Sequence, residues 1–151
     1  MNDVHVSRTF DAPRDLVFKV WTDPAHLAQW WGPHHFTNPR CELEARPGGA
    51  IHIDMRAPDG TVFPMKGEVK EIVPPERLVF SSIPIGPDGE ALFETLITAT
   101  FTQRGDKTTV DVNAHVVRTV APVAAEMLAG MEAGWTQSLE RLEEYVSHVR
   151  R

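Results

Sequence analysis

The sequence has one cysteine in 151 residues, Cys41, so no disulfide can form within the chain. A lone cysteine is typical of a protein in a reducing compartment, so a cytoplasmic location is expected. Long hydrophobic runs are missing too, and none approaches the roughly 18 residues of a membrane helix. The opening segment MNDVHVSRTF lacks the basic and apolar regions of a signal peptide. We therefore expect no membrane association.

Basic residues are outnumbered, because 15 Lys and Arg face 21 Asp and Glu and give a net charge of −6. Binding to a phosphate backbone needs clustered positive charge, so nucleic acid is not expected as a partner. The sequence also lacks the glycine-rich motifs of nucleotide sites and the G-x-S-x-G motif of serine hydrolases. No cofactor is expected. His34 and His35 have no second ligand pair at helical spacing, so no metal site is expected either.

A composition of 42% hydrophobic and 24% charged residues is ordinary for a globular protein, and the length predicts one domain over residues 1–151. Residues 3–10 alternate between apolar and polar types, which predicts a first strand. Two short helices follow. Asp11 is the expected cap of the first, and Asp23 is the expected cap of the second, which would end at Gly32-Pro33.

Residues 38 to 117 have the texture of strands and turns. Turn sequences such as Pro58-Asp59-Gly60 separate alternating segments. The predicted strands are 41–45, 50–57, 63–73, 77–83, 91–103 and 108–117. Connections this short make neighbouring strands antiparallel. In 50–57, Ile51 and Ile53 are expected to face inward and His52 and Asp54 outward, unless the register is reversed by one residue.

The last stretch, 122–149, is predicted as one long helix. Its apolar residues fall in an arc of roughly 80° at 100° per residue: Leu128, Met131, Trp135, Leu139, Leu142, Val146 and Val149. An antiparallel sheet has one apolar face to cover. The sequence therefore predicts an α+β fold in which a curved antiparallel sheet of about seven strands wraps around this helix, and the two short helices close one end.

Four phrases carry a resemblance to a known family: FDAPRDLVFKVWTDPAHLAQWWGP, RPGGAIHIDMRAPDG, FPMKGEVKEIVPPERLVF and GMEAGWTQSLERLEEYV. Together with the order of elements, they resemble the START-like, or Bet v 1-like, helix-grip superfamily, also called SRPBCC. The phrases are most similar to its branch named for activators of the heat-shock-protein-90 ATPase. The resemblance runs from about residue 4 to residue 148, nearly the whole chain.

The resemblance implies a cavity between the gripped helix and the sheet. Related branches bind lipids, steroids, polyketides or plant hormones there, and a few catalyse cyclisation or dehydration. The eukaryotic chaperone activators of the branch carry an additional N-terminal domain, which these 151 residues do not accommodate. A role as a chaperone activator, through an exposed patch rather than a cavity, is therefore an alternative that the family name alone raises.

The candidate ligand-binding residues are large apolar side chains on the expected inward faces, because aromatic rings and methionine suit an apolar pocket. They are Trp30, Trp31, Phe36, Met55, Phe63, Met65, Phe80, Phe93, Ile97, Met127, Met131 and Trp135. For each one, ordinary core packing is the competing interpretation. Gly130 and Gly134 lie beside the helical stripe, where they allow either a close approach or merely a tolerated bend.

Polar candidates for catalysis are few. An enzyme of the cyclase or dehydratase type needs two polar groups that converge in the pocket. His34, His35, Glu68 and Glu94 are available, but nothing in the sequence brings them together, and two solvent-facing histidines are the simpler interpretation of the pair. Cys41 has no evident histidine partner. We therefore assign no catalytic residue.

The favoured interpretation is a protein that binds a small hydrophobic molecule beneath the long helix. The alternatives are an enzyme acting on a hydrophobic substrate and a protein–protein module of the chaperone-activator type. The sequence is compatible with a homodimer and does not fix one.

Overall fold

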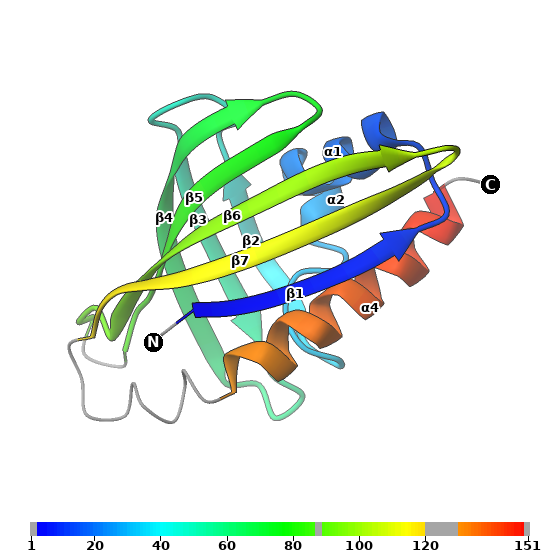
Figure 1. Ribbon diagram of the computed structural model, residues 1–151. Coiled ribbons are helices and arrows are strands. Elements are labelled where there is room, and N and C mark those ends of the chain that lie inside the picture. The colour runs from blue at the N-terminus through cyan, green and yellow to red at the C-terminus, as the bar shows by residue number, and fades with distance from the viewer. Residues whose placement is uncertain (1–2, 87–88, 120–129, 150–151) are drawn as a thin grey trace.

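The computed structural model describes residues 3–86, 89–119 and 130–149 (Figure 1). The strands and helices lie along the chain as follows: β1 (Asp3–Phe10), α1 (Arg14–Thr22), α2 (Pro24–Leu27), β2 (Thr37–Leu43), β3 (Ala50–Arg56), β4 (Val62–Val73), β5 (Arg77–Pro84), β6 (Phe93–Arg104), β7 (Lys107–Thr119) and α4 (Met131–Val149).

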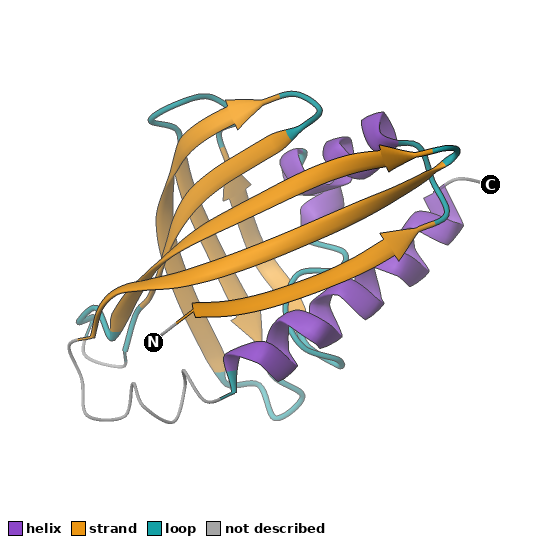
Figure 2. Ribbon diagram, in the orientation of Figure 1, coloured by secondary structure: helices purple, strands orange, loops and turns teal. Residues whose placement is uncertain are grey.

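The strands form one sheet in the order β1-β7-β6-β5-β4-β3-β2, and every neighbouring pair is antiparallel. Figure 2 shows this sheet as a curved layer with the helices on its concave side. The predicted α+β helix-grip architecture is confirmed. Consecutive strands from β2 to β7 are neighbours, and β1 pairs with β7 and forms one edge of the sheet.

Alternation decides which face of each strand is buried. In β3, Ile51 and Ile53 are 3% and 1% exposed and belong to the core. His52 and Asp54 lie on the opposite face and pair with each other at 3.1 Å. The strand register is therefore the expected one, and the reversed register that would have turned the polar pair inward is wrong.

The two short helices begin and end differently from the sequence prediction. The N-cap of α1 is Pro13, which has no side-chain capping bond, and not Asp11. Instead, the amide of Arg14 donates to the side-chain oxygen of Gln103 on β6 at 2.8 Å. Asp23 caps α2 as predicted, accepting from the amide of Ala25 at 3.0 Å. Regular helix in α2 ends at Leu27, because the chain turns there instead of continuing to Gly32.

The long helix α4 is described from Met131, and the predicted helical residues 122–129 lie outside the described residues. Its 19 residues span about 28 Å at 1.5 Å per residue. Trp135, Leu139, Leu142 and Val146 are buried against the sheet and the short helices, as the apolar stripe predicts. Among the described residues, no helix has the length and apolar character needed to cross a membrane.

An aromatic cluster joins α1, the segment after α2, and α4 to the sheet. The ring of Trp21 is parallel to that of Trp135, with centroids 5.9 Å apart, and also contacts Trp30 and Phe101. Trp30 is fully buried, and its indole N–H donates to the carbonyl of Val20 at 3.0 Å. This cluster fills one end of the space between sheet and helix.

Candidate functional site

Two adjoining apolar cavities occupy the other end of that space. The first, called here the helix-side cavity, has a volume of about 190 Å³ and is lined by Trp31, Gly32, Pro33, Met55, Ser82, Pro84, Phe93, Thr95, Ile97, Met131, Gly134, Trp135 and Ser138. The second, the strand-side cavity, has a volume of about 270 Å³ and is lined by Trp31, Pro33, Phe36, Met55, Phe63, Pro64, Met65, Ser82, Pro84, Ile85 and Leu92. The two share five lining residues and form one cleft.

The segment after α2 forms one wall of the cleft. Its backbone turns at Gly32, whose φ of 94° favours glycine. Asn38 donates from its side-chain amide to the carbonyls of Ala28 and Trp31, both at 2.9 Å. Arg141 on α4 donates to the carbonyls of Trp31, Gly32 and Pro33 within 3.1 Å, and to that of Gln29 at 3.3 Å. These bonds hold Trp31 and Pro33 against the cleft.

The strands supply the opposite wall through their register. Met55 on β3 lies opposite Phe63 on β4, and Met65 lies opposite Pro84 on β5. Ser82 on β5 lies opposite Thr95 on β6. Adjacent strands therefore bring these side chains to one region of the concave face.

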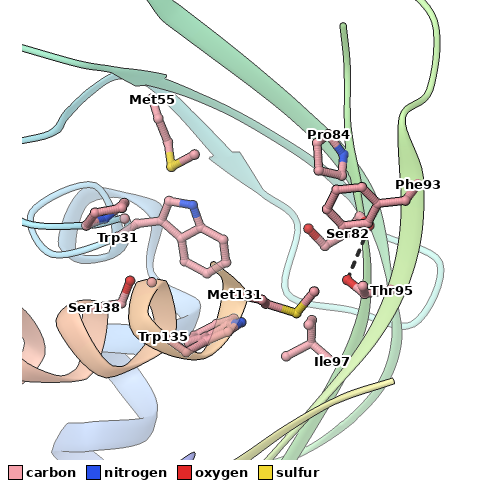
Figure 3. A pocket seen from close by; sticks show the side chains of 13 residues that line it. Trp31, Met55, Ser82, Pro84, Phe93, Thr95, Ile97, Met131, Trp135 and Ser138 are labelled. Atoms are coloured by element: carbon pink, nitrogen blue, oxygen red, sulfur yellow. Dashed lines mark hydrogen bonds between the residues drawn. The ribbon is translucent and has the colours of Figure 1, made fainter. Parts of the chain in front are cut away.

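The helix contributes residues at positions i, i+3, i+4 and i+7, which share one face. They are Met131, Gly134, Trp135 and Ser138. Figure 3 shows Trp31 and Trp135 on one side of the helix-side cavity, the β6 residues Phe93, Thr95 and Ile97 on the other, and Met131 between them.

Nine of the residues singled out in the sequence line the cleft: Trp31, Phe36, Met55, Phe63, Met65, Phe93, Ile97, Met131 and Trp135. Trp30 and Phe80 line neither cavity. Trp30 is turned into the aromatic core by its bond to Val20, and Phe80 packs behind Trp31 with ring centroids 6.1 Å apart. Met127 lies outside the described residues.

Sequence reasoning missed the small and polar lining residues, among them Ser82, Thr95 and Ser138. The signal was present in part: Ser82 follows Leu78 and Phe80 on the inward face of β5, and Ser138 follows Trp135 by one helical turn. Gly134 also lines the cavity, and a Cβ atom built there finds no described residue within 4 Å. Among the described residues, no backbone approaches this glycine closely, and open space lies beside it.

The predicted polar residues do not converge. His34 and His35 are exposed, as expected, and line a separate polar recess of about 480 Å³ with Gln29, Arg141, Glu144, Tyr145 and His148. Glu68 pairs with Lys70, and Glu94 pairs with Arg118. Within residues 3–86, 89–119 and 130–149, no ionisable side chain lines the apolar cleft, and no group of side chains is arranged to hold a metal ion.

Side chains in and beside the polar recess connect α4 to the segment around α2. His34 donates from its amide to Gln137 at 3.1 Å, and its Nε2 lies 2.8 Å from Glu140. The hydroxyl of Tyr145 lies 2.6 Å from Nδ1 of His26, and burial raises the pKa of this tyrosine. These contacts therefore help to hold the segment that forms the cleft wall against α4.

We expect the Cys41 thiol to be unreactive in the folded protein. Burial, together with the neighbouring Glu42 carboxylate, raises the pKa of Cys41 from 9.0 to about 11. At pH 8 its thiolate fraction is then roughly a hundredfold smaller than that of an ordinary thiol. Alkylation by iodoacetamide, followed by mass spectrometry, should be slow in the native protein and fast in denaturant.

The same raised pKa makes stability depend on pH. The folded state favours the neutral thiol, so the neutral Cys41 contributes to the free energy of unfolding. This contribution is complete below pH 9 and is lost as the pH rises toward about 11. In urea titrations, Cys41→Ala should remove this part of the alkaline decline. Equal declines in both proteins would contradict the assignment.

The sheet, the gripped helix and the apolar cleft between them define a protein of the helix-grip, START-like class. The family model described as Activator of Hsp90 ATPase homolog 1-like protein matches residues 11–147, and the chain belongs to this family. No curated protein matches the sequence.

Solved bacterial structures share the fold. A protein from Arthrobacter aurescens superimposes with a TM-score of 0.85 at 24% identity, covering 97% of this chain and 87% of that one. An AHSA1 protein from Silicibacter pomeroyi gives 0.82 at 24% identity, with 96% and 97% covered. A protein from Nitrosomonas europaea gives 0.80 at 22%, with 98% and 96% covered. None of these names states a ligand or a reaction.

Proposed function

We propose that this protein binds a small hydrophobic molecule in the cleft between the sheet and α4. The observation that carries the proposal is the composition of the cleft: two adjoining cavities, lined by tryptophan, phenylalanine, methionine and proline, with no ionisable side chain in the described lining. A concave apolar site with a few polar atoms is the usual form of a small-molecule site.

The dimensions favour a ligand of one or two rings. Neither cavity alone reaches the roughly 300–1,000 Å³ that is common for ligand sites. Their volumes of about 190 and 270 Å³ adjoin at Met55 and Trp31, so a flat molecule can extend from one into the other. The edge-to-face arrangement of Trp31 and Trp135, with centroids 5.4 Å apart, offers ring surfaces to such a molecule.

The described lining gives catalysis no support. General acid–base chemistry needs titratable groups within reach of the substrate. His34, His35, Glu68 and Glu94, the groups available from the sequence, lie outside the cleft. Binding without chemistry is therefore the function that this geometry favours.

Filling the helix-side cavity should weaken binding without unfolding the protein. Gly134→Leu places a side chain into space where a Cβ atom meets none of the described residues within 4 Å. We expect the affinity for 2-acetylnaphthalene, followed by tryptophan fluorescence, to fall by roughly tenfold or more, which corresponds to about 1.4 kcal/mol. Unchanged affinity in a folded Gly134→Leu protein would place the probe elsewhere and contradict the proposal.

Gly134→Ala is the matched control. Alanine removes the helical penalty of glycine, so the free energy of unfolding should rise by about 1 kcal/mol. The single methyl group occupies little of the cavity, so the affinity for the probe should change by about twofold at most. Urea titration measures the first effect and fluorescence the second. A fall in stability would show that the site around Gly134 is tighter than the structure describes.

Native mass spectrometry of the protein purified from cells then tests for a natural ligand. Bound mass that disappears on denaturation, and that is absent from Gly134→Leu, would identify the occupant of this cleft.

A further inference from the structure

Hydrogen-bond donors stand out in the otherwise apolar helix-side cavity. Three hydroxyl groups line it, those of Ser82, Thr95 and Ser138, together with the indole rings of Trp31 and Trp135. The Thr95 hydroxyl donates to the carbonyl of Ser82 at 3.5 Å, the bond drawn in Figure 3. An indole N–H donates and cannot accept.

The two indole N–H groups of the cavity have no acceptor within the described part of the chain. Trp31 and Trp135 are 8% and 9% exposed, so both side chains are more than nine-tenths buried. By contrast, the N–H of Trp30 donates to Val20. Among the described residues, the indole nitrogen of Trp21 is fully enclosed and has no hydrogen-bond partner. The indole nitrogens of Trp31 and Trp135 are not enclosed without a partner in this way. Both rings line the helix-side cavity, so their donors lie within reach of a molecule there.

Figure 3 shows where these nitrogens lie. That of Trp135 is at the end of the ring nearest Met131, facing the β6 side, and that of Trp31 lies on the side of Met55. The Ser138 hydroxyl is one helical turn from Trp135, and Ser138 is 6% exposed. A ligand that covers these N–H groups removes them from water, so a ligand that supplies an acceptor is favoured over one that does not.

The charged groups around the cleft limit the class of ligand further. An anion buried in the cleft would need a cationic partner. Arg141 contacts the backbone of the cleft wall, but its guanidinium group is bound to four carbonyl oxygens. The donors left in the cleft are neutral.

We propose that the ligand is an uncharged, flat ring compound with a carbonyl oxygen, and that this oxygen accepts a hydrogen bond from the indole N–H of Trp135 or Trp31. This inference rests on the proposed function and adds the chemical class of the ligand. The rings of Trp31, Trp135 and Phe93 contact its hydrocarbon part. The indole donors distinguish it from a pure hydrocarbon, and the absence of a cationic side chain from the described lining of the cleft distinguishes it from a carboxylate.

Three matched probes test the proposal: 2-acetylnaphthalene, 2-ethylnaphthalene and 2-naphthoate. The ethyl compound is the more hydrophobic, so burial alone would favour it. We expect the ketone to bind about fivefold tighter than the ethyl compound, as one net hydrogen bond would allow. We expect the carboxylate to bind roughly tenfold or more weakly than the ketone, because its charge must be desolvated.

Two variants assign the donor. Trp135→Phe and Trp31→Phe each keep a ring but remove one N–H. In the variant that loses the bonding donor, the ratio of the ketone affinity to the 2-ethylnaphthalene affinity should fall about fivefold, so that the preference for the ketone disappears. The loss of ring surface weakens both probes alike and cancels in this ratio. Trp30→Phe is the control, because its N–H is bound to Val20 outside the cleft. It should retain the preference.

A spectrum of the unaltered protein gives a second readout that does not depend on a variant folding. In ¹⁵N–¹H correlation spectra, the ketone should shift a cavity indole N–H resonance downfield, and 2-ethylnaphthalene should not. A hydrocarbon that binds as tightly as the ketone overturns the inference and leaves the proposed function standing. Failure of all three probes to bind overturns both. A preference that survives both Trp135→Phe and Trp31→Phe overturns the role of the indoles.

Discussion

Arg141→Met is expected to destabilise the protein by about 2–4 kcal/mol, because hydrogen bonds from a charged donor are worth roughly 1.5–3 kcal/mol each and are not additive. The guanidinium group bonds to four consecutive or nearly consecutive carbonyls, those of Gln29, Trp31, Gly32 and Pro33. Methionine keeps an unbranched apolar stem and removes every donor. The guanidinium group is partly withdrawn from water, and this burial lowers the pKa of Arg141.

The same variant should weaken ligand binding, because Trp31 and Pro33 form part of both cavities. Arg8→Met is the matched control: it removes the exposed ion pair of Arg8 with Glu143, which is expected to contribute only about 0–1 kcal/mol. Urea titrations and probe binding measure the two effects. Equal stability losses in both variants would mean that the carbonyl contacts of Arg141 contribute no more than a surface pair.

Trp21→Ala is expected to lower the free energy of unfolding by about 3–5 kcal/mol, the usual cost of removing a buried tryptophan. Trp21 is 1% exposed and contacts the rings of Trp30, Phe101 and Trp135. Its loss leaves a void under α4 that the surrounding rings cannot fill without moving. Thermal and urea unfolding, read by circular dichroism, measure the change.

Phenylalanine at the same position should be much milder. The indole N–H of Trp21 is buried without a partner in the described residues, so Trp21→Phe removes volume but also an unsatisfied donor. Trp30→Phe removes a similar volume and breaks the bond to Val20, leaving that carbonyl without its donor. We expect Trp30→Phe to be the more destabilising by about 1–2 kcal/mol. The opposite order would show that the N–H of Trp21 has a partner.

The fold could be predicted because each element has its own periodicity. Alternation in 50–57 separates Ile51 and Ile53 from His52 and Asp54, and the apolar stripe of the long helix matches its buried face. Local details were harder. Asp11 has the right residue type for a cap, but a side chain 89 positions away from Arg14, Gln103, supplies the acceptor at the start of α1.

The site was predictable only in its large apolar members. Trp30 and Trp31 are adjacent and chemically identical, yet one faces the core and the other the cleft, because the chain leaves regular helix between Leu27 and Gly32. Periodicity does not specify such a turn. Ser82, Thr95 and Ser138 were missed because a small polar residue on an inward face is unremarkable until the structure shows which part of that face is hollow.

The order of elements along the chain has a consequence for synthesis. Thr9 pairs with Thr109, so β1 cannot pair with β7 until one hundred further residues have been synthesised. The helix that covers the sheet comes later still. Nascent chains therefore carry an incomplete sheet with an uncovered apolar face, a state that attracts other chains. Folding of this protein is expected to be largely post-translational. The chain is expected to be most prone to aggregation before α4 emerges from the ribosome.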